Sequence, residues 1–490
     1  MIAIWIFLGV LVLVLSIVLI RTLTFGARTD EVGPGEMIEV DEGWAAKNLS
    51  GAVKYVTLSD YDFQKTDLRP FDGLYTYLQK VFPLVHKKLE IINELYPARV
   101  YRWMGSRKEL KPIILMGHVD VVPADPDSLK KWKHGPFAGE IAGGYVWGRG
   151  TLDDKGPVVG LLAAAELMLK QGFIPQRTIY FAFGCDEEAS GKIGAARIVD
   201  WLKRKKIEPE AVLDEGAAVV EGVFPGIRGR LGLVDVAEKG YLTVKLSTES
   251  SGGHSATPEG QTAIAILAKA IVRLNDNPMP ANLQLIKSLF GYIGKSSPWA
   301  YRLVFANLWL FSPLAKQMLG KNGTTNAAIR TTMAATMIQG GIRDNVLPTK
   351  AEAAINARLL PGDSVEKVLK YIRKTISDEQ VKVEPVMEFE PSPLSPTDHP
   401  AYDVLRNAIR QGYGDIPVVP FLVIGATDAR YYSAVCKNIY RFAPYLMDKE
   451  SLKTVHGDNE RIASKVLVKM IQVYALIIRG WGIWGTVIRK

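Results

Sequence analysis

The chain has 490 residues, of which 48% are hydrophobic and 23% are charged, a composition of globular proteins that excludes a disordered or fibrous chain. Its length exceeds one compact core and suits about two to four domains. Sixty Lys and Arg against 51 Asp and Glu give a net charge of +9. This excess is mild for the length of the chain and lacks the dense Lys/Arg stripes of a nucleic-acid-binding protein. With only two cysteines, any metal must be held mainly by His, Asp and Glu.

The N-terminus is an apolar segment. Residues 2–20 carry no charge and would span about 28 Å as a helix, close to the thickness of a bilayer core. The segment lacks the charged start and small-residue cleavage site of a signal peptide. We therefore expect a single transmembrane anchor over 1–22, followed by a tether over 23–64. Two arginines after the segment favour a cytoplasmic location for the rest of the chain, but acidic residues follow them, so both orientations stay open.

Beyond the tether, strands alternate with helices. Residues 112–117, 177–184 and 211–214 are short apolar strands. Residues 157–171 predict a helix with Pro in its first turn and Gly just past its end. This alternation predicts an α/β fold with a mostly parallel sheet covered on both faces. Ligands of such sheets bind at the carboxyl ends of the strands.

Polar motifs follow these strands. His118 and Asp120 are two apart after the first strand, so they face the same way and the carboxylate can orient the imidazole of a metal ligand. Taken alone, this pair is more often a structural histidine. The other two strands end in CDEE (185–188) and LDEG (213–216). Carboxylates placed where strands leave the core are costly unless cations neutralise them.

Two further motifs supply polar residues away from those strands. The turn GRGTLDDKG (148–156) contains Asp153 and Asp154, and a helix N-cap is a sufficient explanation for Asp154. Far downstream, VHGDNE (455–460) supplies His456. Histidines combined with carboxylates are ligands that Zn²⁺ and its neighbours prefer.

The order of these motifs resembles that of a known family. GHVDVVPA, GRGTLDDKG, GCDEEASG and TVHGDNE resemble the ArgE/DapE/aminoacylase/carboxypeptidase S family of dinuclear zinc hydrolases, over about residues 65–475. The phrases RLVFANLWLF and TTNAAIRTTMAATMIQGGIRDNVLP are similar to the branch that contains carboxypeptidase S and the secreted N-fatty-acyl-amino-acid synthase/hydrolase.

The resemblance implies two zinc ions per subunit. His118 with Asp214 would bind one metal, Glu188 with His456 would bind the other, and Asp153 would bridge both. Asp120 would hold His118, and Glu187 would be the general base that acts on a metal-bridging hydroxide. The family also implies a cis peptide bond after Asp153.

Residues 239–361 interrupt the catalytic pattern. We expect them to form an inserted α+β lid and dimerisation domain between the two parts of the catalytic domain, 65–238 and 362–490. The resemblance implies a homodimer in which His254 reaches the active site of the partner subunit. It also implies four residues that contact the substrate: Asn345, Arg358, Gly425 and Thr427. A planar guanidinium suits a substrate carboxylate, and a strand-face ion pair is the alternative for Arg358.

Two segments combine basic and aromatic residues without any acidic residue: 281–321 and 461–490. Helical packing inside the lid and at the dimer contact is the default interpretation. The alternative is that these surfaces rest on anionic membrane lipid.

The sequence therefore predicts a membrane-anchored zinc carboxypeptidase or N-acyl-amino-acid amidohydrolase. Its substrate would be a small molecule or peptide with a free carboxylate. A dipeptidase of the same fold is one alternative, and a non-catalytic binding protein on a peptidase scaffold is another. The intact metal and base residues argue against the non-catalytic alternative.

Overall fold

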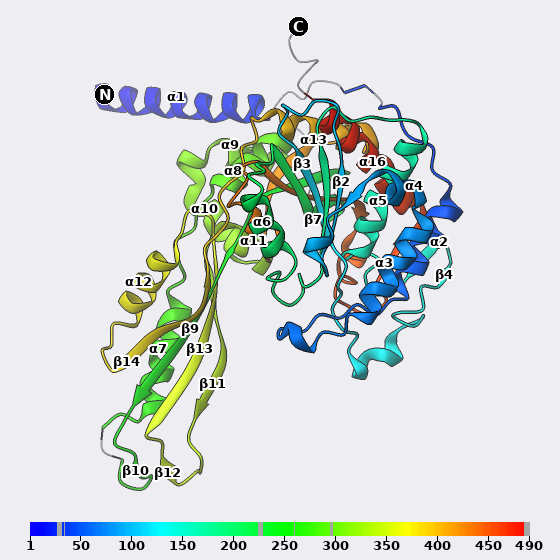
Figure 1. The fold of residues 1–490 in the computed structure, drawn as a ribbon. Coiled ribbons are helices and arrows are strands. Elements are labelled where there is room, and N and C mark those ends of the chain that lie inside the picture. The colour runs from blue at the N-terminus through cyan, green and yellow to red at the C-terminus, as the bar shows by residue number, and fades with distance from the viewer. Residues whose placement is uncertain (27–31, 34, 224–228, 259, 295–296, 485–490) are drawn as a thin grey trace.

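A computed structural model of the chain describes residues 1–26, 32–33, 35–223, 229–258, 260–294 and 297–484. It consists of a large body, a small domain that extends away from the body, and an N-terminal helix that projects from the body (Figure 1).

The body is built on an eight-stranded sheet in the order β1-β2-β6-β3-β7-β16-β8-β15. In chain order its strands are β1 (Glu90–Ile91), β2 (Arg99–Trp103), β3 (Ile113–His118), β6 (Ile179–Gly184), β7 (Ala211–Glu221), β8 (Arg230–Glu238), β15 (Val418–Val423) and β16 (Ile439–Met447). The three predicted strands are β3, β6 and β7, and β3 pairs in parallel with both of the others. However, β2 runs antiparallel to β6, and β8 runs antiparallel to β7. The sheet is therefore mixed, which corrects the prediction of a mostly parallel sheet.

Helices cover both faces of this sheet. The central helix α5 (Lys155–Lys170) packs on β3 and against α16 (Ser464–Ile483) and α2 (Glu42–Val53), whereas α6 (Ala195–Arg204) packs on β6 (Figure 1). The other helices of the body are α3 (Arg69–Val81), α4 (Pro83–Lys88), α13 (Pro400–Tyr413), α14 (Ala429–Tyr432) and α15 (Lys449–Leu452). A three-stranded sheet of β4 (Ile141–Ala142), β5 (Tyr145–Trp147) and β17 (Arg461–Ala463) joins the two parts of the body.

The segment that can serve as a tether is shorter in the structure than the sequence predicted. Helix α2 buries Ala45, Leu49 and Val53 in the core of the body and contacts α16 and α5. The apolar face of α2 therefore makes it part of the body, so a tether can reach only to about residue 41 and not to residue 64.

The small domain contains a four-stranded antiparallel sheet in the order β11-β13-β9-β14. Its elements are β9 (Gly240–Glu249), β10 (Gly253–His254), α7 (Ala263–Asp276), β11 (Thr332–Gly340), β12 (Val346–Leu347), β13 (Lys350–Leu359), α12 (Val365–Ile376) and β14 (Val381–Phe389). A separate hydrophobic core lies between this sheet and its two helices. Because β14 pairs with β9 along most of its length, the small domain continues to Phe389 and does not end at residue 361.

Four helices inside the predicted lid return to the body. They are α8 (Gln284–Ile293), α9 (Trp299–Ala306), α10 (Leu308–Gly320) and α11 (Gly323–Ile329). Helix α8 packs on β15, and Ile286, Phe290 and Ile329 belong to the core of the body. The default interpretation of residues 281–321 is packing inside the lid and at the dimer contact. The lid part is wrong, because these helices pack on the body, and the dimer contact stays a prediction.

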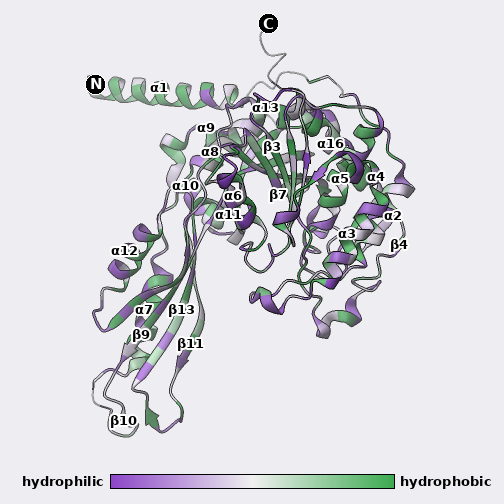
Figure 2. Cartoon of the chain, in the orientation of Figure 1, coloured by the Kyte–Doolittle hydropathy of each residue, from purple (hydrophilic) through white to green (hydrophobic). Residues whose placement is uncertain are grey.

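Two described helices are long and apolar enough to cross a membrane. The apolar window of α1 (Ile2–Thr24) is only 6% buried, and the helix is hydrophobic up to Arg21 near its C-terminal end (Figure 2). The corresponding window of α16 is 61% buried, and Trp481 near its end is fully enclosed. Helix α16 is thus a core helix, and Trp481 cannot face lipid as the alternative interpretation of residues 461–490 proposed.

Candidate metal centre

The acidic and histidine side chains meet at the carboxyl ends of three neighbouring strands, β6, β3 and β7. His118 ends β3, Glu187 and Glu188 follow β6, and Glu215 follows the part of β7 that pairs with β3. The turn before α5 adds Asp153. Nitrogen and oxygen atoms from His118, Asp153 and Glu188 lie close enough to one another to hold a cation, and so do those of His118, Asp154 and Glu215.

His118 is buried between carboxylates. Its Nε2 lies 2.9 Å from Asp153 Oδ1 and 3.3 Å from Glu215 Oε1. Its Nδ1 lies 3.0 Å from the main-chain oxygen of Asp120 and 3.3 Å from that carboxylate. Burial acts to lower the pKa of His118, but the carboxylates around the ring outweigh it and hold the pKa well above its usual value. A ring held so strongly by anions has the environment of a cation ligand.

His456 approaches the same aspartate from the other side. Its Nε2 lies 2.8 Å from Asp153 Oδ2 and 3.1 Å from Glu188 Oε1. Hydrogen bonds to these two carboxylates raise the pKa of His456 to about 10. The backbone of His456 has a φ of +57°, in the left-handed region that non-glycine residues seldom adopt. Asp153 therefore contacts one imidazole through each of its oxygens.

Asp120 fixes two parts of this arrangement at once. Besides facing His118, its carboxylate accepts hydrogen bonds from the backbone N–H groups of Glu187 (3.2 Å) and Glu188 (3.1 Å) and from the Ser59 hydroxyl (2.6 Å). It thus holds the end of β3 to the acidic turn after β6. Burial, aided by neighbouring carboxylates, raises the pKa of Glu187 well above its usual value.

The structure places Glu215, and not Asp214, against His118. Asp214 accepts a hydrogen bond from the backbone N–H of Ala429 at 2.8 Å. Between Asp214 and Ala217 the pairing of β7 with β16 is interrupted, and Gly216 there has a φ of +138°. This bulge turns Glu215 towards His118, so the sequence-based placement of Asp214 beside His118 is corrected.

Asp154 occupies the predicted N-cap position of α5. Its carboxylate makes no capping hydrogen bond to α5 but accepts one from the backbone N–H of His118 at 3.0 Å. The peptide bond between Asp153 and Asp154 is cis, as the resemblance implied. Burial raises the pKa of Asp154 well above its usual value.

Sequence reasoning missed Glu460. This buried carboxylate accepts hydrogen bonds from the N–H groups of Gly150 (3.0 Å) and Leu152 (2.8 Å) and from the guanidinium of Arg149 (2.6 Å). Arg149 also donates to the main-chain oxygen of His456 at 3.2 Å. Glu460 thus ties the turn that carries Asp153 to the turn that carries His456. The sequence did contain a signal for this pair, because Arg149 lies in the motif GRGTLDDKG and Glu460 lies in the motif VHGDNE.

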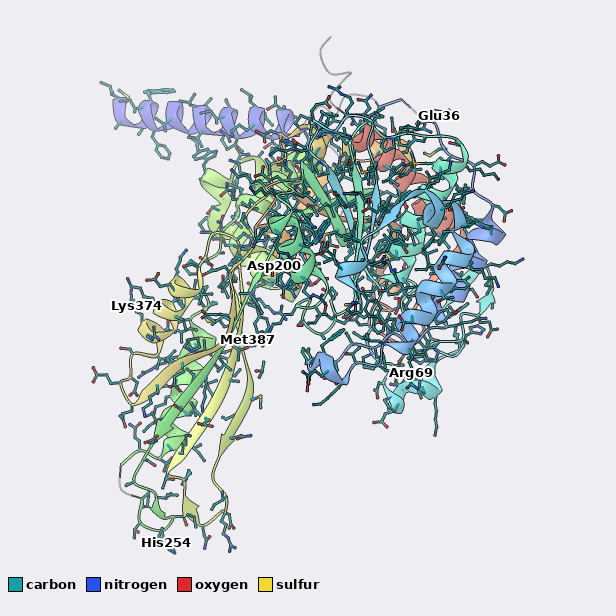
Figure 3. All side chains as sticks on the ribbon, viewed as in Figure 1. Glu36, Arg69, Asp200, His254, Lys374 and Met387 are labelled. Atoms are coloured by element: carbon teal, nitrogen blue, oxygen red, sulfur yellow. The ribbon has the colours of Figure 1, made fainter. Side chains whose placement is uncertain are left out.

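The residues expected to contact substrate do not lie together. His254 lies at the far tip of the small domain (Figure 3), and β10 pairs there with β12, next to Asn345. Arg358 lies on β13 in the four-stranded sheet, at the end nearer the body, with its guanidinium 4.6 Å from the centre of the Tyr241 ring. Within one chain, the structure does not bring His254 or Asn345 to the metal centre.

The predicted loop after β15 approaches the centre through Thr427. Its N–H donates to Glu238 at 2.6 Å, and its hydroxyl hydrogen-bonds to Asp214, which lowers the pKa of that carboxyl against the dominant effect of burial. Gly425 is exposed in the same loop. Thr427 therefore supports the strand that carries Glu215.

Comparisons with known proteins find relatives over most of the chain. The model of Peptidase family M20/M25/M40 matches residues 114–480. The chain is 38% identical to "Probable carboxypeptidase S-like 2" of Dictyostelium discoideum over 89% of this chain and 84% of the relative. It is 37% identical to "N-fatty-acyl-amino acid synthase/hydrolase PM20D1" of Xenopus tropicalis over 96% and 94%, and 32% identical to carboxypeptidase S of Saccharomyces cerevisiae over 85% and 80%.

The fold matches solved structures of the same kind. An M20 family metallo-carboxypeptidase from Sulfolobus solfataricus superposes with a TM-score of 0.63 at 18% identity, covering 90% of this chain and 100% of that one. Human carnosine dipeptidase 1 superposes with a TM-score of 0.57 at 15% identity, covering 90% and 96%. These structures show a shared fold, and the family match together with the relatives in sequence shows that the chain is a hydrolytic enzyme that belongs to peptidase family M20/M25/M40.

Proposed function

We propose that the chain is a membrane-anchored dinuclear zinc hydrolase that cleaves the amide bond of N-acyl amino acids or C-terminal peptide bonds. The observation that carries this proposal is the position of Asp153. Its two carboxylate oxygens lie 2.9 Å and 2.8 Å from the Nε2 atoms of two different histidines. A carboxylate between two nitrogen donors suits the bridging position of a two-metal site.

The donor set divides into two halves around Asp153. His118 and Glu215 would hold one zinc ion, and His456 and Glu188 would hold the other. Imidazole and carboxylate donors of this kind suit zinc. When bound, two zinc ions would lower the pKa of a water molecule and polarise the scissile carbonyl.

Glu187 would move the proton. Hydrogen bonding of its N–H to Asp120 fixes the backbone beside His118, and the charges of His118 and Glu215 both act on its carboxyl. From this position Glu187 would accept the proton of the attacking water and return it to the leaving amine.

Arg358 is suited to the free carboxylate of the substrate. Among the described residues it makes no ion pair, and its guanidinium lies over the Tyr241 ring. This argues against the strand-face ion pair that was the alternative. An unpaired guanidinium at the base of the small domain leaves a bidentate donor for a carboxylate. A relative at 37% identity is named as a synthase/hydrolase of N-fatty-acyl amino acids, which supports acyl amino acids as the substrate class.

A second copy of the chain would complete the site. His254 lies at the tip of the small domain, away from the body that holds the metal centre (Figure 3). Within the described residues, β11 pairs only with β13, and Met337 and Ile338 on β11 are exposed. An exposed apolar edge strand is suited to pairing with a second copy. We propose a homodimer in which the small domain acts as a lid and carries His254 to the partner's site.

Helix α1 would anchor this enzyme. It has the length and apolar composition of a membrane span and is almost entirely exposed. A 23-residue helix without internal charge up to Arg21 is stable in a bilayer.

A substrate panel tests the proposal on the full-length chain reconstituted in nanodiscs. We expect zinc to restore, after chelation, hydrolysis of N-fatty-acyl amino acids, with two zinc ions bound per chain. The matched control is the same substrate with its carboxylate converted to a carboxamide, which should be cleaved poorly. Equal cleavage of the carboxamide, or cleavage of dipeptides alone, would contradict the proposed substrate class.

A further inference from the structure

We propose that α9 and α10 form a surface that rests on the lipid bilayer next to α1. This interfacial surface consists of Trp299, Trp309, Leu310, Leu314 and Met318. The inference rests on the proposed membrane span of α1, and it adds a second contact that sets how the body sits on the membrane.

The end of α1 is fastened to this part of the body. Arg302 of α9 donates to the main-chain oxygens of Thr22 (2.9 Å) and Leu23 (3.2 Å) in α1. Arg21 donates in return to the main-chain oxygen of Ala306 at 3.1 Å. These bonds satisfy carbonyl groups in the last turn of α1, which have no partner within the helix.

The loop between α9 and α10 continues the contact. The amide of Asn307 donates to the Thr22 hydroxyl at 3.1 Å and to the main-chain oxygen of Val18 at 3.3 Å. Both Asn307 and Thr22 are fully buried. Figure 1 shows α9 directly beside the C-terminal end of α1. The α9–α10 corner is therefore held at a fixed level along the anchor.

That level corresponds to the edge of a bilayer. The contact extends over Val18–Leu23, which is about 7.5 Å at the rise of an α-helix, and the apolar part of α1 lies on its N-terminal side. A tilted α1, as spanning helices commonly are, would place the α9–α10 corner where the hydrocarbon core gives way to lipid headgroups, and it would keep the small domain, which extends to the same side of the body as α1 in Figure 1, on the water side. Tryptophan side chains concentrate at this depth in membrane proteins.

The exposed side chains of the corner suit that position. Trp299 and Trp309 are each 55% exposed, and Leu310, Leu314 and Met318 are 44–45% exposed. The last three are four residues apart on α10, so they form one stripe along the helix. Ala315, between them in sequence, is buried against the body. An apolar stripe with two tryptophans is unusual on a water-facing surface.

Charge favours a lipid surface over a second copy of the chain as the occupant. No acidic residue occurs between Asp276 and Asp344, and Lys316 and Lys321 are exposed on and after α10. Such a surface is attracted to anionic headgroups. A second copy would present the same positive charge and would be repelled.

Depth measurements on the full-length chain test this proposal. Single cysteines carrying an environment-sensitive fluorophore are placed at Leu314 and Met318, since the two native cysteines are buried. Val12 in α1 serves as the control for membrane insertion. Arg69 at the far side of the body and Lys374 on the small domain serve as water-exposed controls (Figure 3). Each labelled protein is reconstituted in vesicles that contain phosphatidylserine and lipids with a quencher at a shallow or a deep position.

The quenching pattern separates the outcomes. We expect the shallow quencher to act several-fold more strongly on probes at Leu314 and Met318 than on those at Arg69 and Lys374, and the deep quencher to act most on Val12. If the probe at Val12 is quenched while the probes at Leu314 and Met318 behave like the one at Arg69, α1 spans the membrane but the proposed interfacial surface does not contact lipid. If Val12 is not quenched either, both the span and the interfacial surface fail. Fluorophore shifts at Leu314 that occur equally in detergent, without lipid quenching, would show a protein contact and also overturn the proposal.

Discussion

The guanidinium of Arg149 donates to the carboxylate of Glu460 at 2.6 Å, and both side chains are buried. The two residues are 311 positions apart in the sequence. Because Glu460 also accepts hydrogen bonds from the turn that ends in Asp153, this ion pair joins the two chain segments that supply Asp153 and His456.

Removing one partner of this pair should be costly. Arg149→Met leaves the Glu460 carboxylate buried without its counter-ion, and we expect it to destabilise the body by about 3–5 kcal/mol. Urea unfolding of the metal-free protein, followed by circular dichroism, measures this loss. The matched control is Lys453→Met, because Lys453 pairs with Glu450 on the surface and exposed pairs contribute less than about 1 kcal/mol. Equal midpoints for the two variants would show that Glu460 does not organise the centre.

The bulge in β7 gives opposite expectations for two adjacent acids. Glu215→Gln should reduce bound zinc from two ions to one per chain, because the Glu215 carboxylate faces His118. Asp214→Asn should retain both ions, since an amide oxygen can still accept the hydrogen bond from Ala429. Metal content after dialysis, measured by mass spectrometry, separates the two assignments. Loss of zinc from Asp214→Asn alone would restore the original assignment of Asp214.

Glu187→Gln should separate proton transfer from metal binding. The change keeps the size of the side chain and the backbone hydrogen bond to Asp120, so zinc content should stay at two ions per chain. Turnover should fall by about 10²–10⁴-fold, the usual contribution of a general base. Steady-state hydrolysis of an N-acyl amino acid measures the effect, with Glu450→Gln on the surface as the control. Residual activity near that of the unaltered enzyme would exclude Glu187 as the base.

The metal-free protein should lose stability as pH rises. Hydrogen bonds to Asp153 and Glu188 raise the pKa of His456 from its usual value of 6.5 to about 10, so the folded state binds this proton more tightly than the unfolded chain. The resulting stabilisation is complete below about pH 6.5 and disappears as pH approaches 10. Burial raises the pKa of Glu215 to about 8, which acts in the same direction between about pH 4.5 and 8.

Thermal unfolding at pH 6 and pH 9 measures this trend. His456→Gln should reduce the dependence between these values, whereas His134→Gln, outside the centre, should leave it unchanged. Zinc should stabilise the protein more at pH 9 than at pH 6, because its ligands must lose their protons to bind. A metal-free protein that is equally stable at both pH values would contradict the inferred environment of His456.

The sequence predicted which segments meet at the centre better than which atoms face one another. The apolar runs that end in His118, in Glu187 and Glu188, and in Asp214 and Glu215 became neighbouring strands, because parallel strands bring their carboxyl ends to one edge. The choice between Asp214 and Glu215 depends on a bulge that only pairing with β16 reveals.

Long-range packing accounts for the other differences. The role of Glu460 depends on its ion pair with Arg149, which is 311 positions away in the sequence. Similarly, the sequence pattern of α8 and α9 predicts an apolar face on each helix but does not predict whether that face packs on the small domain or on the body. Their contacts with β15 and α1 decide this, and sequence periodicity does not encode the partner of an apolar face.

The place of His254 at the tip of the small domain predicts complementation between subunits. His254→Ala removes the histidine from the lid, and Glu187→Gln removes the base from the body, so each variant alone should be inactive. In a heterodimer of the two, one site would combine an intact Glu187 with an intact His254 of the partner subunit. Random assembly should then restore about a quarter of the activity, because half of the dimers are mixed and each has one complete site.

Co-expression of the two variants with different affinity tags, followed by tandem purification, provides the measurement. The purified heterodimer should have about half of the unaltered activity per dimer, given one complete site in two. A pair of Glu187→Gln and Asp120→Asn is the matched control, since both residues lie in the body of the same chain and should not complement through the lid. An inactive mixed dimer would place His254 outside the reaction, and an active His254→Ala homodimer would do the same.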